Sequence, residues 1–335
     1  MDFTPDNEQK ALREAVRDML KRTTPPDTIG LPVHDPEQWQ QFVEMGLVAL
    51  PFDDSAGPVE VMLVAEELGR ARVRSPYVDV LLAGHLLAAT GQGDLLDAMG
   101  EGQALVLPAL AEPGRSWQSA ASVTASGDAL SGTKDPVPYA AAATHVIVSS
   151  TQGLHLVEHP PVSGSGIALD ATPATLLTED HSVLAPALNL ATVALCAEAL
   201  GAMSAAVDLS VDYLKTRKQF GVPLMSFQAL THRAADLYVS LELARSTVQY
   251  AAMSLAEDPG DSELVSRTKV IVGKSGRLIG QEAIQLHGGI GMTAEYSVGH
   301  LTARLTAIEH TFGDTRQHLG ALARSLSGHT TVDVV

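Results

Sequence analysis

Two stretches of the sequence contain carboxylates that could act as a general base. Near the C-terminus, LTARLTAIEHTFGDTRQHLGALARSL (residues 301–326) holds Glu309, His310 and Asp314 within six positions. Carboxylates and imidazole are the side chains that enzymes most often use to remove a proton. A further carboxylate, Glu198, interrupts the apolar run ATVALCAEALGAMSAAV, where a buried charge requires a partner. Glu309, Asp314 and Glu198 are therefore candidate bases, with His310 as a fourth group to consider.

The C-terminal cluster falls at a junction between two predicted helices. Helical periodicity runs up to Thr311, and a second helix is expected to begin after Gly313 with Asp314 as its N-cap. In that structural interpretation Asp314 accepts a backbone hydrogen bond instead of a substrate proton. The residues of the cluster alone leave both interpretations open.

The other candidates also have structural interpretations. Glu309 would form a solvated pair with Arg304 or another surface cation, and His310 would be a surface residue at a helix end. Glu198 would make an interhelical hydrogen bond or a contact with another subunit. The remainder of the chain has to decide between these uses and a catalytic one.

Composition restricts the kind of protein. The chain has 335 residues, of which 45% are hydrophobic and 18% charged, so it is long enough for two or three domains with a well-buried core. A net charge of −17 argues against nucleic acid or an anionic membrane as the main partner. The single cysteine, Cys196, excludes an internal disulfide framework and a cysteine-based zinc site, and no metal site is expected.

The location of the protein is predicted to be cytoplasmic. The first residues, MDFTPDNEQK, lack the basic and apolar regions of a signal peptide. The most apolar helical segment contains Glu198 and is judged too short to span a bilayer comfortably. We therefore expect no membrane insertion.

The predicted elements change type twice along the chain. Helical patterns such as EQKALREAVRDMLKR, EQWQQFVEMGLVAL and VEVMLVAEELGRA fill the first part, short strands such as ATHVIVSS and GLHLVEH the middle, and long helices the remainder. The helices of the last part are expected at 190–216, 227–256, 260–286, 296–311 and 315–327. We predict a mostly α, α+β fold with an N-terminal helical domain (1–103), a middle antiparallel sheet or small barrel (104–188) and a C-terminal four-helix bundle (189–335).

Several motifs of the C-terminal half resemble the acyl-CoA dehydrogenase family of flavoproteins. They are TRKQFG, SFQAL and QLHGGIG, in the family's order and separation, and AEELGRA and the opening residues resemble its N-terminal helices. The resemblance implies the family's fold, FAD as cofactor and an acyl-CoA thioester as substrate. In that reaction a carboxylate removes a proton from the α carbon while FAD takes hydride from the β carbon.

The resemblance also implies cofactor-binding residues. In the family these segments reach across a subunit interface to the FAD of a neighbouring chain. The positions carried over are Arg217, Phe220, Gln228, Gln285, Leu286, His287, Gly288 and Gly289. A guanidinium matches phosphate oxygens, and paired glycines permit close approach of a phosphate to the backbone. We therefore expect these residues to bind FAD.

The positions of the family's catalytic base depart from the pattern. Phe312 falls where many members carry the catalytic glutamate, followed by Gly313 at the usual glycine. A second group of members keeps the base near the start of the long helix before TRKQFG, where this chain has Ala191 followed by Thr192. Neither position provides a base.

The middle region departs from the family as well. The stretch RSWQSAASV replaces the usual serine-containing flavin-binding segment, and Asp135, Pro136 and Pro138 replace residues that grip the flavin ring. Proline has no backbone N–H to donate. The half-site that a subunit builds for its own flavin is therefore predicted to be degraded, while the half that it lends to a neighbour is intact.

In this asymmetry the chain resembles the small subunits of bacterial heterotetrameric acyl-CoA dehydrogenases. Those enzymes act on bulky acyl-CoA thioesters, including sterol-derived ones. The resemblance implies a longer acyl-CoA dehydrogenase-like partner that supplies the base, and an electron-transfer flavoprotein as acceptor. Two alternatives stay open: a homo-oligomeric dehydrogenase with a relocated base at Glu309, Asp314 or Glu198, and a flavin-free scaffold subunit.

Overall fold

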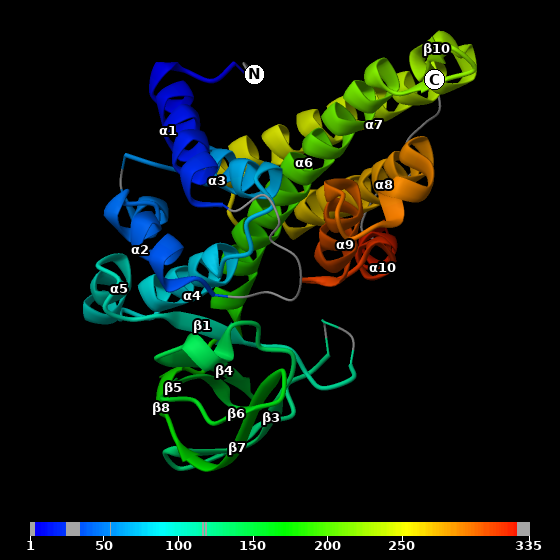
Figure 1. The fold of residues 1–335 in the computed structure, drawn as a ribbon. Helices are drawn as coiled ribbons and strands as arrows, with labels where there is room; N and C mark the ends of the chain where they lie inside the picture. The colour runs from blue at the N-terminus through cyan, green and yellow to red at the C-terminus, as the bar shows by residue number, and fades with distance from the viewer. Residues whose placement is uncertain (1–3, 25–33, 54, 116, 118, 327–335) are drawn as a thin grey trace. The chain divides into compact units, whose positions relative to one another are not determined.

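The computed structural model describes residues 4–24, 34–53, 55–115, 117 and 119–326. The chain forms two compact units, a helical unit of residues 1–29, 62–73 and 192–335 and a mixed unit of residues 30–61 and 74–191. Figure 1 follows the chain from blue helices through green strands to the yellow and red helices. The predicted order of helices, strands and helices is confirmed.

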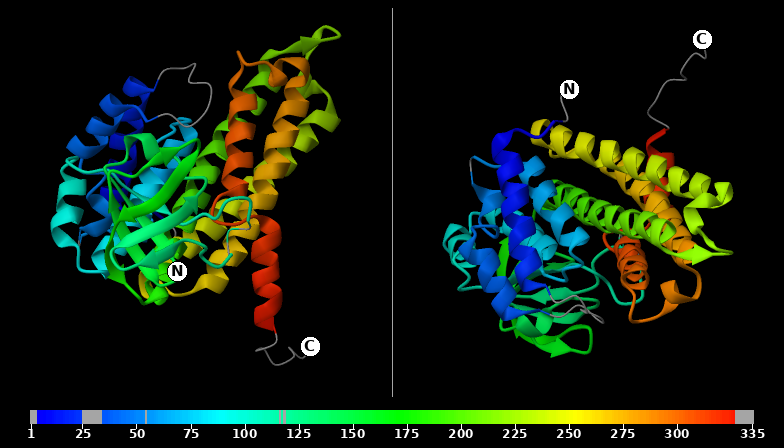
Figure 2. Two further views of the ribbon diagram at one scale, coloured as in Figure 1. Left: turned by 90° about the horizontal axis from the view of Figure 1, so that it is seen from below. Right: turned by 45° about the horizontal axis from the view of Figure 1, so that its top comes forward.

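The helical unit is built on three long helices, α6 (Leu184–Thr216) from residue 192 onward, α7 (Gln228–Glu257) and α8 (Ser262–His287). They lie side by side in Figure 2, and α8 also packs against α9 (Ser297–His310) and α10 (Thr315–Ser325). The short helix η5 (Gly288–Met292) follows α8. Asp261 caps α8 by accepting a hydrogen bond from Leu264 N at 2.9 Å, which explains why the helix begins there.

The N-terminal helix α1 (Asn7–Thr23) and most of α3 (Pro58–Arg70) complete this unit. Helices α3 and α6 cross at van der Waals contact through two glycines. A Cβ on Gly69 would lie 1.8 Å from the carbonyl oxygen of Glu198, and one on Gly201 would lie 1.8 Å from that of Glu66. Any larger side chain at either position would force the helices apart, so glycine is required on both.

The mixed unit contains α2 (Pro36–Glu44), η1 (Leu50–Phe52), α4 (Tyr77–Ala89), α5 (Gly93–Gly100) and two four-stranded sheets. The first sheet has the order β1 (Val106–Ala109), β4 (His145–Ser150), β5 (Gly153–Glu158), β8 (Thr175–Thr178). The second has the order β2 (Thr124–Ser126), β3 (Ala129–Lys134), β7 (Gly166–Pro173), β6 (Val162–Ser163). Strands β1 and β4 are parallel, so the expectation of a purely antiparallel sheet is wrong.

Some predicted boundaries require correction. The helix expected to run through Leu50 ends at Glu44, because Gly46 has φ +72° and the chain turns there. Helix α5 was not expected, and α6 begins at Leu184, before the predicted domain start at residue 189. The three domain limits remain a prediction, and residues 327–335 of the last one lie outside the described residues.

The apolar helix also requires a correction. With the preceding turn η3 (His181–Val183), the helical stretch His181–Thr216 has 36 residues and a mean hydropathy of 1.7, so it is long enough to cross a bilayer. In the structure 67% of its most apolar window is buried. Burial among other helices, and not shortness, identifies it as a core helix.

Candidate functional site

Arg217 and Phe220 lie on a small hairpin between α6 and α7. Strands β9 (Lys218–Gln219) and β10 (Val222–Pro223) pair across a two-residue turn of Phe220 and Gly221, with φ values of +52° and +85°. Two left-handed residues in succession suit the twist of a tight hairpin. Phe220 is 92% exposed. The hairpin therefore presents an aromatic ring to the exterior at some conformational cost.

The polar residues predicted around this hairpin are exposed as well. Arg217 and Gln228 are both exposed, and among the described residues no carboxylate forms an ion pair with Arg217. Gln228 is the first residue of α7, whose N-cap Phe227 offers no side-chain hydrogen bond to the helix. The guanidinium, the amide and the uncapped helix end are thus available to a ligand outside the helical unit.

The end of α8 supplies the second predicted segment. Gly288 ends the helix with φ +65°, and Cβ atoms added at Gly288 or Gly289 would meet nothing within 4 Å. Gln285 is exposed, whereas the side chains of Leu286 and His287 are buried, with 5% and 3% of their surfaces exposed. Leu286 and His287 can therefore offer a ligand only their backbone.

Three aromatic rings bring the two segments to one end of the bundle. His287 lies 4.5 Å from Tyr213 of α6 and 4.9 Å from Tyr296, measured between ring centroids. Its Nδ1 donates to the carbonyl oxygen of Ala283 at 2.7 Å, and burial lowers the pKa of His287, which favours a neutral ring at pH 7. The neutral ring packs between the tyrosines and fixes the end of α8 beside the end of α6.

The α9–α10 junction has the predicted N-cap. Asp314 accepts a hydrogen bond from Gln317 N at 2.8 Å, and the Gln317 side chain accepts from Asp314 N at 2.9 Å. This reciprocal capping box confirms the structural interpretation of Asp314. Its carboxylate is held by the helix that it begins.

Glu309 does not occupy the predicted environment. It is 8% exposed, and its Oε1 accepts a hydrogen bond from Thr315 N at 2.9 Å, with Arg277 Nη2 at 3.8 Å. The expected pair with Arg304 is wrong, because Arg304 binds Glu198, and the expected solvation is wrong, because Glu309 is buried. The alternative of another surface cation is met by Arg277, whose side chain is 66% exposed. His310 is exposed, as predicted.

Buried groups hold the carbonyl oxygens of this junction. Lys269, which is 1% exposed, donates through Nζ to the carbonyl oxygens of Ile308 at 2.6 Å and Thr311 at 2.7 Å. His318 Nε2 donates to the carbonyl oxygen of Phe312 at 3.0 Å. Burial lowers the pKa of Lys269 and that of His318. Phe312 itself is 6% exposed with φ +56°, so the turn is fixed around an apolar ring.

Glu198 forms a buried ion pair between helices. Its two carboxylate oxygens accept hydrogen bonds from Arg304 Nε at 2.6 Å and Nη2 at 2.9 Å, and Glu198 is 4% exposed. The pair joins α6 to α9, which confirms the interhelical interpretation. Ala191 and Thr192 are also buried in α6, so the alternative base position contains no carboxylate.

The middle-region residues at and around the positions that depart from the family's flavin-binding pattern make contacts within the mixed unit. The Lys134 ammonium forms an ion pair with Glu112 and donates to Ser149 Oγ at 2.9 Å, all three being buried. Asp135 accepts from Ser165 Oγ at 2.5 Å, and its bond to Pro136 is cis. Ser116 and Gln118 of the segment RSWQSAASV lie outside the described residues.

Sequence reasoning missed the residues that support the site. Lys269, His318, Tyr213 and Tyr296 were not singled out. A lone lysine on the apolar face of SELVSRTKVIVGKSG was the available signal for Lys269, since a buried ammonium needs acceptors. The contact between Tyr213 and His287 has no comparable sequence signal, because the two residues lie 74 positions apart.

Comparisons with known proteins agree with these features. Residues 182–327 match the family model described as "Acyl-CoA dehydrogenase, C-terminal domain". The acyl-CoA dehydrogenase IpdE2 of Mycobacterium tuberculosis is 30% identical over 315 residues, covering 88% of this chain and 90% of the relative. A steroid ACAD variant, Tcur3481-Tcur3483, superposes with a TM-score of 0.87 and 27% identity, over 96% of this chain and 98% of the other. The ChsE4-ChsE5 complex from Mycobacterium tuberculosis has the same fold, with a TM-score of 0.87, 24% identity, and 99% and 100% coverage.

Proposed function

This chain belongs to the acyl-CoA dehydrogenase family, and we propose that it is the short subunit of a heteromeric enzyme of that family. In this proposal the chain completes the FAD site of a longer, catalytic subunit. The enzyme desaturates an acyl-CoA thioester between its α and β carbons. Its proposed substrates include thioesters of bulky or sterol-derived acyl groups. An electron-transfer flavoprotein is the proposed acceptor, and the cytoplasm the proposed location.

The observation that carries the proposal is the exposure of the cofactor-binding motifs at one end of the bundle. Arg217, Phe220 and Gln228 face outward, as do the open glycines at the end of α8. Neighbouring apolar side chains are exposed too: Val222 (40%), Met225 (47%), Ile290 (44%) and Met292 (75%). A surface of this kind, with a cation and amides among apolar groups, suits a flavin nucleotide held against another protein chain.

Each residue has a distinct proposed task toward the cofactor. FAD, when bound, supplies hydride acceptance. The Arg217 guanidinium binds pyrophosphate oxygens, the Gln228 amide hydrogen-bonds to polar edges of the nucleotide, and Phe220 covers it from water. The backbone at Gly288 and Gly289 permits close approach, since no Cβ fills that space.

The hydrogen bonds that this chain's candidate bases already make support a partner that supplies the base, although Glu309 Oε2 is left without one among the described residues. Both oxygens of Glu198 are paired with Arg304, and Asp314 and Glu309 accept hydrogen bonds from the backbone at the start of α10. By the family resemblance, Phe312 occupies the position at which many members carry the catalytic glutamate. These engagements speak against a self-sufficient enzyme with a relocated base. The similar steroid ACAD Tcur3481-Tcur3483 is designated by two components, as the proposed two-chain assembly would be.

Flavin counting tests the proposal. The chain is purified alone and after co-expression with a longer family member from the same genome, and flavin absorbance is measured per polypeptide. We expect the chain alone to be colourless and the complex to hold about half a flavin per polypeptide. Arg217→Met should weaken FAD retention by the complex by about 10- to 100-fold, the effect of losing a charged hydrogen bond.

A matched control separates this effect from a general loss of charge. Arg267 is likewise an exposed arginine of the helical unit, but it lies in the first turns of α8 and pairs with Glu263. Arg267→Met should leave flavin content unchanged. One FAD per chain in a homo-oligomer would contradict the proposal, and a colourless, active complex insensitive to Arg217→Met would indicate a scaffold subunit.

A further inference from the structure

A cavity lies in the helical unit, away from the residues proposed to bind flavin. It has a volume of about 460 Å³ and is formed by the C-terminal halves of α1 and α3 and the residues that follow α3. This volume lies within the usual range for a small-molecule site. Its residues include Arg17, Lys21, Arg70 and Arg72, with Glu67 as an acidic neighbour.

The charge of this cavity is opposite to that of the chain. Four of its eight lining residues are cationic and one is acidic, whereas the chain has 22 Lys and Arg against 39 Asp and Glu. The C-terminal ends of α1 and α3 explain part of this excess, because each carries about half a negative charge. The lining itself carries four cations and one acidic residue, and Asp18 and Asp208 lie beside it as partners of Lys21 and Arg70.

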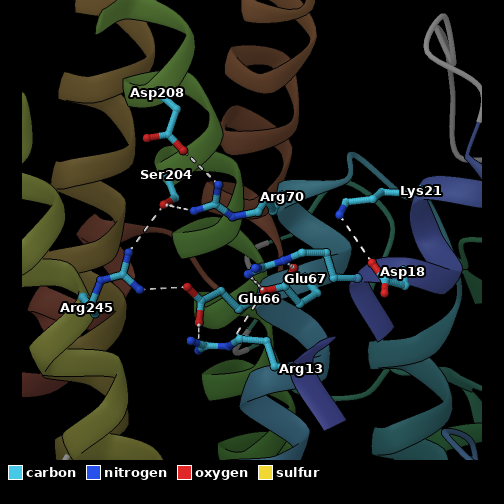
Figure 3. A network of polar contacts seen from close by, with 10 residues as sticks. Arg13, Asp18, Lys21, Glu66, Glu67, Arg70, Ser204, Asp208 and Arg245 are labelled. Carbon is cyan, nitrogen blue, oxygen red and sulfur yellow. Dashed lines mark hydrogen bonds and ion pairs between the residues drawn. The ribbon is translucent and has the colours of Figure 1, made fainter. Parts of the chain in front are cut away.

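The arginines are held in place before any ligand arrives. Arg17 binds both oxygens of Glu67, with Nε at 2.9 Å and Nη2 at 2.7 Å, and Glu67 raises the pKa of Arg17. Arg70 binds Asp208 at 2.8 Å and Ser204 Oγ at 2.6 Å. Figure 3 shows Arg70 and Lys21 on α3 and α1, with Asp208 and Asp18 as their partners. Asp208 and Asp18 have side chains 62% and 64% exposed, so water screens their charges.

The conformation of Arg72 is an independent sign that this cavity has a use. Arg72 follows the end of α3 with φ +61°, where glycine is the usual residue. Its position is fixed by Val73 N, which donates to the carbonyl oxygen of Leu68 at 2.9 Å. A side chain in this backbone region costs free energy that glycine would avoid. Arg72 is one of the residues that line the cavity.

We propose that the cavity is a binding site for a phosphate-bearing small molecule. Guanidinium groups match phosphate oxygens in two-point contacts, and Leu20 and Ala71 provide an apolar wall for an organic substituent. The shared chemistry is the phosphate group, which a free inorganic anion or a nucleotide would supply. This site does not depend on the proposed flavin function.

Calorimetric titration of the full-length protein tests the proposal, at low ionic strength with inorganic phosphate, pyrophosphate and ADP as separate probes. We expect saturable binding of at least one probe, and the preferred probe distinguishes a free anion from a nucleotide. Arg72→Gly and Lys21→Met should each weaken it by about 10-fold or more. Arg72→Gly also removes the positive-φ arginine, so the variant should fold at least as stably as the wild type.

Arg22→Met is the matched control, because Arg22 stands next to Lys21 in the last turn of α1 but does not line the cavity. It changes the net charge equally and should leave the affinity within about 2-fold. An equal loss in Arg22→Met would overturn the proposal in favour of diffuse electrostatic attraction. Absence of saturable binding by all three probes would overturn it too, including the case in which only an acidic peptide binds.

Discussion

At the scale of single residues, several buried titratable groups of this chain hold helices and helix ends together. Glu198, Glu309 and Lys269 are all buried, and each makes at least one hydrogen bond to another helix or to a helix end, although Glu309 Oε2 has no hydrogen-bond partner among the described residues. A buried charge without a partner is costly, so these contacts must form when the chain folds. Substitutions at such residues should therefore act mainly on stability.

The buried pair between Glu198 and Arg304 gives the first prediction. Glu198→Gln should lower the free energy of unfolding by about 3 to 5 kcal/mol, because the Arg304 guanidinium loses its counter-charge inside the protein. Urea denaturation followed by circular dichroism measures this change. Glu263→Gln, which breaks the exposed pair with Arg267, should cost less than about 1 kcal/mol. A catalytic role for Glu198 would be supported if Glu198→Gln abolished dehydrogenation without loss of stability.

His85 gives a prediction about pH. It lies in α4 with its ring 5.1 Å from that of Phe52, and burial lowers the pKa of His85 to about 4. The unfolded chain, with an ordinary pKa near 6.5, binds the proton more tightly than the folded protein. The contribution of neutral His85 to the free energy of unfolding is therefore fully present above about pH 6.5. This contribution falls by about 3 kcal/mol as the pH is lowered to about 4.

The measurement is urea denaturation at pH 7 and at pH 4.5 for the wild type and His85→Leu. Removing the imidazole should reduce the loss of stability between the two pH values. The exposed His310 provides the control, since His310→Leu should leave that loss unchanged. Equal pH dependence in His85→Leu and the wild type would contradict the assignment.

At the scale of elements, small residues on α8 and α6 set how closely helices approach. A Cβ on Gly273 would lie 2.2 Å from Glu309 Oε2 and 2.4 Å from Thr315 Oγ1, both buried at the junction. At Gly276, three residues along the same helix, the nearest atom would be a Leu305 carbon at 3.5 Å, which is ordinary contact. Gly273 and Gly276 of α8 thus differ in how much space their neighbours leave for a side chain.

This difference predicts opposite outcomes for two alanine variants. Gly273→Ala should destabilise the protein by about 1 to 3 kcal/mol, because the junction has to move away from α8. Gly276→Ala should be neutral or stabilising by up to about 1 kcal/mol, because alanine is the better helix former. Thermal unfolding of both variants checks the pair. Equal effects would show that the α9–α10 junction yields more easily than its buried contacts indicate.

The elements also show how far sequence reasoning reaches. Capping and periodicity predicted the α9–α10 junction and its N-cap Asp314, because those signals lie within a few residues of one another. The partner of Glu198 could not be predicted, because Arg304 lies 106 positions away and only the packing of α6 against α9 brings them together. The parallel pairing of β1 with β4 was missed for the same reason.

At the scale of the whole molecule, the residues that we propose bind FAD all lie in one of the two units. Arg217, Phe220 and the glycines of α8 all belong to the helical unit and face outward from it. The motif resemblance predicted that Leu286 and His287 take part in binding FAD. In the structure both side chains are buried, so only their backbone is accessible to a ligand. The number of flavins in the proposed two-chain assembly remains a prediction.

Phe220 gives the last prediction, which concerns this assembly. Because its side chain is 92% exposed, Phe220→Ser should leave the melting temperature of the isolated chain unchanged. In the complex the ring is expected to be buried against FAD and the partner, so the same substitution should weaken flavin retention by about 10-fold or more. Flavin release during dilution and gel filtration measures it. Val162→Ser, at an exposed valine (46%) of strand β6, is the control and should retain flavin. Full flavin retention by Phe220→Ser would place this hairpin outside the cofactor site, whatever the remaining motifs do.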